Sequence, residues 1–309
     1  MIRYLKQDEI DKVKWDSCIK QSFNGNIYAW SWYLDIVHPE WHALVENDYE
    51  RVFPLTGKRK FGLSYLFQPF FAQQLGIYSR TLLNPDIIDD FLEAIPAKFR
   101  FAEIRLNTHN KPGEQNKGLS WHRNHELDLI NNYDRIYKNY SSNTKRNLKK
   151  AEQAKLQLVK NVNPENVIAL FRANRGRTIS HWNDLEYNRL KQLAYTGIYR
   201  GQAGVFGVYS KPNELCAGAI FMRSHGKLVF LFSGTSQEAK TNHALSFLID
   251  EVIKMHCPGQ LVFDFEGSDQ PGLARFYKGF GSKETYYPGI KINRLPLLGR
   301  LALRIVKRH

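Results

Sequence analysis

Four charged side chains flank one predicted turn towards the C-terminal end of the chain. Asp264 and Glu266 belong to the strand-like stretch before the turn, and Arg275 and Lys278 belong to the helix-like stretch after it. A carboxylate at such a turn can orient or deprotonate an attacking amine. It can equally pair with Arg275 or Lys278, or with a basic helix upstream, and only stabilise the turn. The residues themselves leave both roles open.

The elements around this turn follow from alternation and spacing. Apolar and polar residues alternate over 261–266, which predicts a strand. Gly267 breaks the pattern, and Ser268 or Asp269 is predicted to cap a helix that begins near Pro271. The strand therefore delivers two carboxylates to the turn, and the helix brings two cations back towards it.

A second group of charges lies in a predicted helix over residues 143–155. Neighbouring like charges four residues apart each cost a few tenths of a kcal/mol, roughly 0.2–0.5. An anion bound between these cations would offset the repulsion, and the other interpretation is a solvated linker helix. The cations are Lys145, Arg146, Lys149, Lys150 and Lys155.

The composition predicts a soluble protein of two domains with anionic partners. The chain has 309 residues, 43% of them hydrophobic, and a formal net charge of +14. Such a field concentrates nucleic acid, nucleotide-linked substrates or anionic lipids without choosing among them. Three cysteines without disulfide or zinc spacing favour reduced thiols and a cytoplasmic location. His122 and His125 have no third ligand nearby in the sequence, so no metal site is expected.

The composition of the two terminal segments indicates whether the protein could associate with a membrane. The N-terminus becomes polar too early for a signal peptide, and no apolar run approaches the length of a membrane span. Residues 295–309 combine apolar side chains with arginines and a lysine. Such a segment can lie on the anionic cytoplasmic face of the membrane, or it can dock on the protein and expose its charges.

The order of predicted elements occurs twice along the chain. Each half is expected to contain a strand, two helices, three antiparallel strands, a helix and a final strand. This order suggests a duplicated α+β unit. The predicted domains are 1–135 and 136–309, separated in the polar stretch that follows residue 130.

Local signals place several of these elements. A hairpin is predicted around Asn47, and Asn84-Pro85 and Asn163-Pro164 are predicted to begin helices. A strand is predicted from Lys227, directly after a His-Gly turn. The helix that follows is expected to bury a stripe formed by Leu245, Leu248, Ile249 and Val252.

Three motifs resemble the FemABX-like branch of the GNAT acyltransferase superfamily. They lie at residues 263–281 and 142–152, which span much of the C-terminal half, and more loosely at 68–76. The resemblance implies two tandem GNAT-like domains, each with a mixed, largely antiparallel sheet flanked by helices. The overall fold class is then α+β.

The same resemblance implies roles for individual residues. Arg275 and Lys278 fall on basic motif positions, where a cation can stabilise negative charge on a carbonyl oxygen or a phosphate. Tyr277 stands where a basic residue is usual. The predicted catalytic residues are Lys278, Arg275, Asp264 and Glu266. The predicted substrate-binding residues are Lys145, Arg146, Asn147, Lys150, Ser268 and Tyr277.

Residues 237–244 differ from the corresponding loop of coenzyme A-dependent GNAT enzymes. Those enzymes hold pyrophosphate on a glycine-rich loop before a helix. Here the stretch has no glycine and carries Glu238. The FemABX-like branch shares this departure and takes its acyl group from aminoacyl-tRNA. Thr241 and Asn242 are the predicted caps of the next helix and the candidate cofactor contacts.

The sequence thus predicts an N-acyltransferase in which an amine attacks an activated ester or thioester. The resemblance favours aminoacyl-tRNA as co-substrate, no tightly bound cofactor, and an amino group of an anionic, lipid-linked cell-wall precursor as acceptor. The first alternative uses an acyl thioester of coenzyme A or acyl carrier protein and acylates an amino acid, lipid or polysaccharide unit. The second is a catalytically inactive module that binds an anionic polymer or a membrane.

Overall fold

The computed structural model describes residues 1–60, 62–179, 182–211, 214–267 and 269–296. Two compact units are present: Met1–His122 with the described residues from Tyr286 onward, and Arg123–Thr285. This division differs from the predicted boundary at 135/136. The reason is that β8 (Leu119–Asp128) and β14 (Lys283–Asn293) each contain residues of both units. From residue 297 onward, the predicted basic tail lies outside the described residues.

The first unit contains a small antiparallel sheet with the strand order β1-β2-β3-β6. A tight turn at Asn47, whose φ is 49°, joins the second and third strands, as the sequence predicts. Trp15 and Trp41 are fully buried, with their ring centroids 4.6 Å apart. The strands and helices are β1 (Ile2–Leu5), η1 (Gln7–Glu9), α1 (Lys12–Gln21), η2 (Ile27–Ala29), α2 (Ser31–Val37), β2 (His42–Glu46), β3 (Arg51–Leu55) and β6 (Tyr78–Ser79).

The same unit contains part of a second sheet, formed by β4 (Gly57–Lys60), β5 (Leu63–Leu66), β7 (Phe99–Arg105) and β14. The pairs β4/β5 and β7/β14 are antiparallel, and β5/β7 is parallel. The apolar side of α3 (Pro85–Glu93) packs into the core of this unit. Asn84 caps α3 by accepting the N–H of Ile87, and Pro85 begins it, which confirms the predicted start of this helix.

The second unit is built on the strand order β8-β13-β12-β11-β10-β9. Only β12 and β13 are parallel among these described pairs, and the others are antiparallel. Parallel pairing follows from the crossover through α9, which returns the chain to the same end of the sheet. The strands are β9 (Gln157–Lys160), β10 (Ala203–Lys211), β11 (Glu214–Ser224), β12 (Lys227–Thr235) and β13 (Val262–Asp264).

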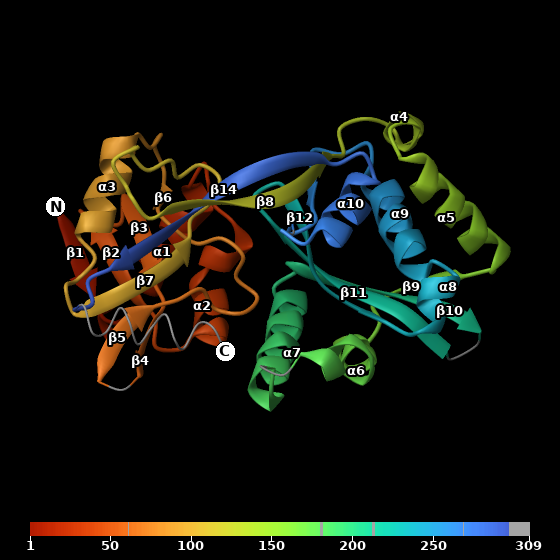
Figure 1. Ribbon diagram of the computed structural model, residues 1–309, viewed down its shortest axis with the longest axis horizontal. Coiled ribbons are helices and arrows are strands. Elements are labelled where there is room, and N and C mark those ends of the chain that lie inside the picture. The colour runs from red at the N-terminus through yellow and green to blue at the C-terminus, as the bar shows by residue number, and fades with distance from the viewer. Residues whose placement is uncertain (61, 180–181, 212–213, 268, 297–309) are drawn as a thin grey trace. The chain divides into compact units, whose positions relative to one another are not determined.

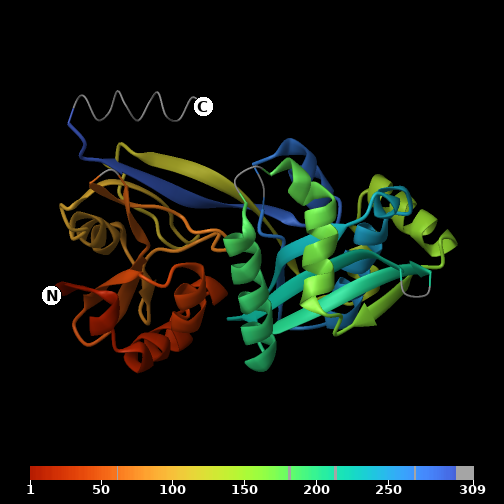
Figure 2. The same ribbon diagram turned by 90° about the horizontal axis from the view of Figure 1, so that it is seen from below.

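Helices cover both faces of this sheet (Figure 1). On one face α9 (Ala244–His256) packs on β10 and β11, and α5 (Ser142–Gln153) packs on α9. On the other face α6 (Pro164–Ala173) and α7 (Asp184–Tyr199) lie against β10–β12, which Figure 2 shows from below. Leu248, Ile249 and Val252 form the predicted buried stripe of α9. The shorter helices are α4 (Tyr133–Lys138), η3 (Arg175–Thr178), α8 (Glu238–Thr241) and α10 (Pro271–Lys278).

The repeated order of elements is confirmed, except that five strands, β2–β6, lie between α2 and α3 where three antiparallel strands were predicted, and these five divide between two sheets. The first copy runs from β1 through α1 and α2, the strands that follow, and α3 to β7; the second runs from β9 through α6 and α7, β10–β12, and α9 to β13. In both copies an apolar helix follows the antiparallel strands and buries one side against the sheet. In the second copy this arrangement places the end of β13 and the start of α10 next to each other.

Candidate active site

The turn between β13 and α10 is held close to β8. Gly267 has a φ of +40°, and a Cβ atom there would lie 2.3 Å from the carbonyl oxygen of Arg123. Asp269 does not cap α10 as predicted, because its Oδ1 accepts the backbone N–H of Arg123 at 3.0 Å. Gln270 occupies the N-cap position, and its side chain does not form a cap hydrogen bond with the helix. The other predicted cap, Ser268, lies outside the described residues.

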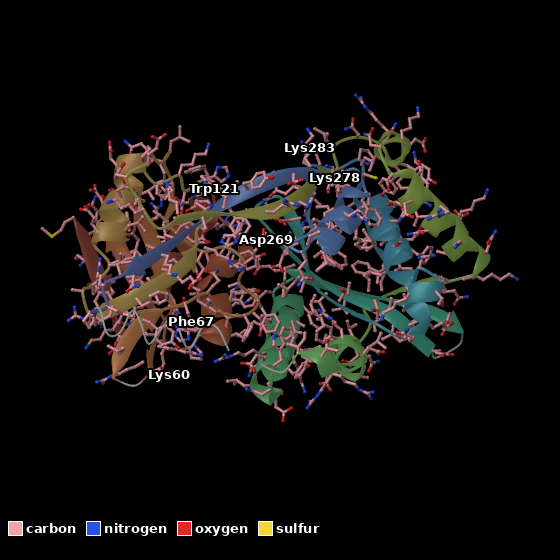
Figure 3. All side chains as sticks on the ribbon, in the orientation of Figure 1. Lys60, Phe67, Trp121, Asp269, Lys278 and Lys283 are labelled. Carbon is pink, nitrogen blue, oxygen red and sulfur yellow. The ribbon has the colours of Figure 1, made fainter. Side chains whose placement is uncertain are left out.

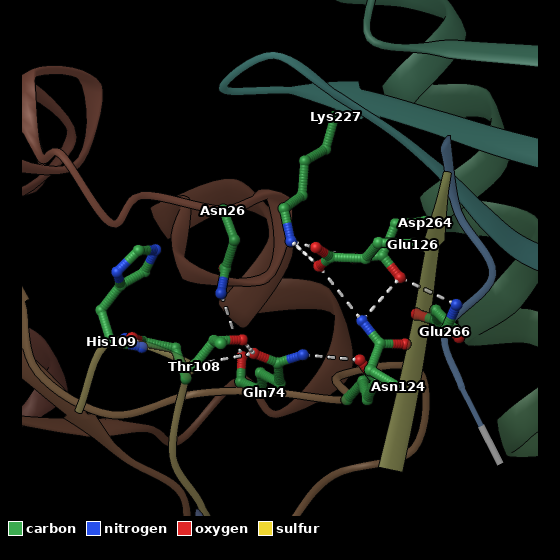
Figure 4. Close-up of polar contacts among 11 residues, drawn as sticks. Asn26, Gln74, Thr108, His109, Asn124, Glu126, Lys227, Asp264 and Glu266 are labelled. Atoms are coloured by element: carbon green, nitrogen blue, oxygen red, sulfur yellow. Dashed lines mark hydrogen bonds and ion pairs between the residues drawn. The ribbon is translucent and has the colours of Figure 1, made fainter. Parts of the chain in front are cut away.

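Asp264, at the end of β13, is the centre of a buried polar cluster (Figure 4). Its Oδ2 accepts a hydrogen bond from Lys227 Nζ at 3.2 Å. Its Oδ1 accepts from Asn124 Nδ2 at 3.0 Å and from the backbone N–H of Glu266 at 2.9 Å. Lys227 Nζ also bonds Glu126. Both oxygens of Asp264 are therefore engaged, and this geometry favours an anchoring role for the residue. Its predicted catalytic role stays a prediction.

The sheet register explains why a lysine is needed here. Asp264 and Glu126 are direct cross-strand partners on β13 and β8, so two carboxylates lie side by side. Lys227, on the adjacent strand β12, supplies the compensating charge. Burial lowers the pKa of Lys227, but Asp264 and Glu126 outweigh this effect and raise it above its ordinary value. The cluster is thus a compensated ion group within one sheet.

Sequence reasoning assigned Asp264 the wrong partners for an ion pair. The alternatives were Arg275, Lys278 or the basic helix, whereas the observed partner is Lys227. Lys227 and Glu126 were not selected as site residues. The signal in the sequence was weak: Lys227 is the first residue of a predicted strand directly after a His-Gly turn. Its pairing depends on the parallel register of β12 and β13.

The cations of α10 are in a different environment (Figure 3). Arg275 and Lys278 are exposed, and neither forms an ion pair with a carboxylate in the part of the chain that the structure describes. Tyr277 is 9% exposed, and its ring lies 5.0 Å from that of Phe265. Most of Tyr277 therefore belongs to the core, which leaves only an edge of it for the predicted substrate contact.

His125 lies behind α10 and was not predicted as a site residue. It is fully buried, its Nδ1 lies 3.4 Å from Ser282 Oγ, and its Nε2 has no hydrogen-bond partner among the described residues. Burial lowers the pKa of His125; Arg123 and Lys278 lower it further, while Glu284 opposes them. The imidazole is therefore neutral near pH 7, and the cations near it are Lys278 and Arg123, of which Arg123 pairs with Glu284 at 2.9 Å.

The basic helix α5 begins where α10 ends. The backbone N–H of Ser141 donates to the carbonyl of Gly279 at 2.9 Å, and Ser141 Oγ caps α5 by accepting the N–H of Thr144. A Cβ atom on Gly279 would lie 2.4 Å from Thr144 Oγ1. This close approach places the first turn of α5 next to the residue that follows Lys278.

The predicted substrate-binding residues of α5 do not act as one group. Arg146 and Lys150 lie towards His243, just before α9; burial lowers the pKa of His243, and these two cations lower it further. Lys145 instead donates to the carbonyl of Lys138 at 2.9 Å and lies over the Tyr137 ring. Asn147 is half-buried, and no hydrogen bond of its side chain is found within the described ranges. The structure thus groups Arg146 and Lys150 and separates Lys145 from them.

The predicted cofactor contacts also differ from each other. The N-cap position of α9 is His243 instead of the predicted Asn242, although Asn242 Oδ1 accepts the N–H of Ala244, the first residue of the helix, at 3.1 Å. Thr241 Oγ1 donates to the carbonyl of Glu238 at 2.8 Å and closes α8, so its predicted capping of α9 is wrong. Asn242 therefore lies beside His243, on the side to which Arg146 and Lys150 point.

The residues of the motif at 68–76 form hydrogen bonds to other residues of the first unit. Gln68 Oε1 accepts the N–H of Arg105 at 3.0 Å, and Gln74 Oε1 accepts both the N–H and the hydroxyl of Thr108. Asn26 donates to the Gln74 carbonyl, as Figure 4 shows. Gly76 has a φ of +109° and touches Asn110 closely. These contacts give residues 68–76 a structural role, because they hold this loop against neighbouring segments of the first unit.

Among the described residues, no cluster of three or more histidine, cysteine, aspartate or glutamate side chains could hold a metal ion. Within the same residues, no helix combines the length and the apolar character needed to cross a bilayer.

Comparisons with known proteins identify the fold. No family model and no curated protein matches the sequence. The structure of FemX matches with a TM-score of 0.64 at 12% identity, over 97% of this chain and 99% of FemX. The C-terminal domain of a putative lysylphosphatidylglycerol synthetase from Agrobacterium fabrum matches with a TM-score of 0.54 at 12% identity, over 95% and 94%. L-PGS from Bacillus licheniformis matches with a TM-score of 0.55 at 11% identity, over 96% of each chain.

These likenesses extend over nearly the whole chain in each case. They confirm the predicted α+β fold, which this chain shares with FemX over nearly its whole length. At such low identities they establish the fold and leave the substrates to the chemistry of the site.

Proposed function

We propose that this protein is an N-acyltransferase that joins an activated aminoacyl or acyl group to an amine. The observation that carries the proposal is the cation Lys278 on α10, which has no carboxylate partner among the described residues and lies next to a neutral histidine and to the first turn of the basic helix α5. A nearby carboxylate would cancel its charge, but Asp264 and Glu126 are compensated by Lys227. Lys278 therefore remains available to a substrate.

The reaction needs this kind of charge. The amine nitrogen attacks the acyl carbonyl carbon, and negative charge develops on the carbonyl oxygen before the bond to the leaving oxygen or sulfur breaks. The amine loses a proton, and the leaving group takes one up. A cation beside the carbonyl oxygen lowers the barrier, and alignment of donor and amine supplies much of the remaining rate. We assign the role of the cation beside the carbonyl oxygen to Lys278.

The donor that we favour is aminoacyl-tRNA. Arg146 and Lys150 point to the same side of α5, next to the capped start of α9, and together they can neutralise phosphates of an RNA backbone. The loop before α9 has no glycine, in agreement with a donor other than coenzyme A. For the acceptor, the resemblance supports an amine of an anionic cell-wall precursor. The likeness to lysylphosphatidylglycerol synthetases gives a lipid headgroup as the second candidate.

A transfer assay tests the reaction. The full chain is incubated with a tRNA pool charged with radiolabelled amino acids and with a membrane extract that contains lipid-linked precursors. We expect label to move from tRNA to an acceptor by a route that ribonuclease pretreatment abolishes. Transfer from acyl-coenzyme A with ribonuclease resistance would favour the thioester alternative, and binding without transfer from either donor would favour an inactive binding module.

The cations of α5 lie in two directions, Arg146 and Lys150 towards His243 and Lys145 towards α4, and this difference provides a matched pair of variants. Arg146→Gln with Lys150→Gln should weaken tRNA binding and reduce the slope of log affinity against log salt by about 1–2, because up to two fewer phosphates are neutralised. Lys145→Gln, which removes an ammonium group that donates to the backbone carbonyl of Lys138, should change the slope much less. Equal slopes for both variants would contradict tRNA binding at this face of α5.

A further inference from the structure

The first unit contains a cavity that the proposed transfer reaction does not use. Its volume is about 570 Å³, within the range of small-molecule sites. Its walls come from the η1 region, the α2–β2 turn, the β4–β5 hairpin and the start of β7. Figure 3 marks this hairpin by Lys60. All of the lining residues belong to the first unit.

The cavity is lined by four cations, which are Lys6, Lys58, Arg59 and Lys98. All four are exposed, and none of them forms an ion pair with a carboxylate among the residues that the structure describes. Two carboxylates, Asp8 and Glu40, also line the cavity, so positive charge is in excess. Four cations around one hollow repel one another, and an anionic ligand would offset that repulsion.

Two of these cations are held in place by aromatic rings. Lys98 Nζ donates to Tyr4 Oη at 2.7 Å and lies 4.4 Å from the centroid of the Tyr4 ring. Lys58 Nζ lies 4.6 Å from the centroid of the Phe67 ring. Contacts of this kind restrict a long side chain without neutralising it. Lys58 and Lys98 are therefore partly ordered and still carry full charge.

His42 provides a further polar group in the wall. Its Nδ1 is buried and has no hydrogen-bond partner within the described residues, which leaves Nε2 as the nitrogen that can bond a ligand. Burial lowers the pKa of His42; Lys98 and Lys6 lower it further, while Glu40 and Asp8 oppose them. The imidazole is thus neutral near pH 7 and can donate one N–H without adding to the repulsion among the cations.

We propose that this cavity binds an organic phosphate that carries hydroxyl groups, such as a sugar phosphate. Lysines and a planar guanidinium are the side chains that bind phosphate oxygens, and Arg59 can do so in a bidentate manner. His42 and Ser64 can donate to the same group, while Asp8 and Glu40 can accept hydrogen bonds from ligand hydroxyls. The site is independent of the proposed transfer chemistry, because it contains none of the residues assigned to it.

Binding of glucose 6-phosphate to the full chain, measured by titration calorimetry, tests the proposal. We expect saturable binding that Lys58→Gln with Arg59→Gln weakens by about tenfold or more, with no binding of glucose itself. Lys20→Gln, an exposed lysine on α1 outside the cavity, is the control and should leave affinity unchanged. Absence of saturable binding, or equal affinity in the double variant, would overturn the proposal.

Two further measurements make the test independent of the double variant. Nuclear magnetic resonance should show the pKa of His42 rising when glucose 6-phosphate saturates the protein, because a bound anion favours the charged imidazole. An unchanged titration of His42 at saturation would refute binding in this cavity.

Vesicles of phosphatidylcholine with phosphatidylinositol phosphate distinguish whether the bound phosphate belongs to a lipid or to a free metabolite. Vesicle binding that glucose 6-phosphate competes away assigns the site to a lipid headgroup. Calorimetric binding without vesicle binding assigns it to a free metabolite.

Discussion

Lys227 and Lys278 are both associated with the segment from β13 to α10, yet their surroundings differ. Lys227 is on a strand, its side chain is 31% exposed, and it bonds Asp264 and Glu126. Lys278 is on a helix surface and has no carboxylate partner among the described residues. A sheet fixes its neighbours by register, so a charge within it must be compensated by the protein. A charge on an exposed helix face is solvated by water, so it needs no partner within the protein and is available to a ligand.

The same contrast separates two buried carboxylates of the second unit. Asp264 accepts three hydrogen bonds, one of them from Lys227. Asp250, on α9, instead accepts hydrogen bonds from Tyr133 Oη at 3.0 and 2.9 Å. Hydrogen bonds from a phenol compensate a buried negative charge less completely than a cation does. We therefore expect Asp250 to make the stability of this unit depend on pH.

The largest expected effect is on stability, from loss of the compensating lysine. Lys227→Met leaves two adjacent carboxylates without a cation and should lower the free energy of unfolding by about 3 kcal/mol, the lower end for a broken buried pair because Lys227 keeps some exposure. Urea denaturation at neutral pH measures this change. Lys283→Met, at an exposed lysine at the start of β14, is the control and should cost under about 0.5 kcal/mol.

A second variant separates charge from packing at this cluster. Adding Glu126→Gln and Asp264→Asn to Lys227→Met removes the unpaired charges and should restore much of the lost stability. If Lys227→Met is as stable as the Lys283→Met control, the contrast between the two lysines is not one of structural compensation.

The next effect is on turnover and rests on the proposed function. Lys278→Ala should lower kcat by about 100-fold or more, equivalent to about 2.7 kcal/mol, because a cation at the developing oxyanion is lost. Its free energy of unfolding should change by less than about 0.5 kcal/mol, since no ion pair is broken. Single-turnover rates and thermal melting on the same preparation measure both quantities, with Lys283→Ala as the control. A fully active Lys278→Ala protein would exclude this residue from the mechanism.

The smallest effect is the pH dependence of Asp250. Burial raises the pKa of Asp250 from 3.8 to about 6, although the hydrogen bond from Tyr133 favours the ionised form. Because the folded pKa lies above the unfolded one, this contribution to stability is fully present below about pH 4 and is lost as pH rises through about 6. We expect a loss of about 2 kcal/mol for the wild type, below the limit of about 3 set by a shift of two units.

Asp250→Asn removes the titrating group and should abolish this part of the pH profile. The measurement is the free energy of unfolding of both proteins at several values between pH 4 and pH 7. Parallel profiles for wild type and variant would show that Asp250 does not contribute to the pH dependence of stability.

Much of the fold follows from local sequence signals. Asn84 with Pro85 and Asn163 with Pro164 begin helices as predicted, because capping involves residues two or three positions apart. The buried stripe of α9 and the repeated order of elements are equally local patterns. The motif around Lys278 identified α10, and the structure places that lysine on its exposed surface.

Only the tertiary structure decided which charges are compensated. Lys227 meets Asp264 and Glu126 across separations of 37 and 101 residues, and their contact requires the parallel register of β12 and β13 and the antiparallel register of β13 and β8. The same holds for Lys145, which bonds a carbonyl on α4, and for the cavity of the first unit, which four separate segments line. Sequence spacing determines caps and helix faces because those contacts span a few residues. Strand register depends on packing of the whole sheet, and it was the register that separated the anchoring charges from the available ones.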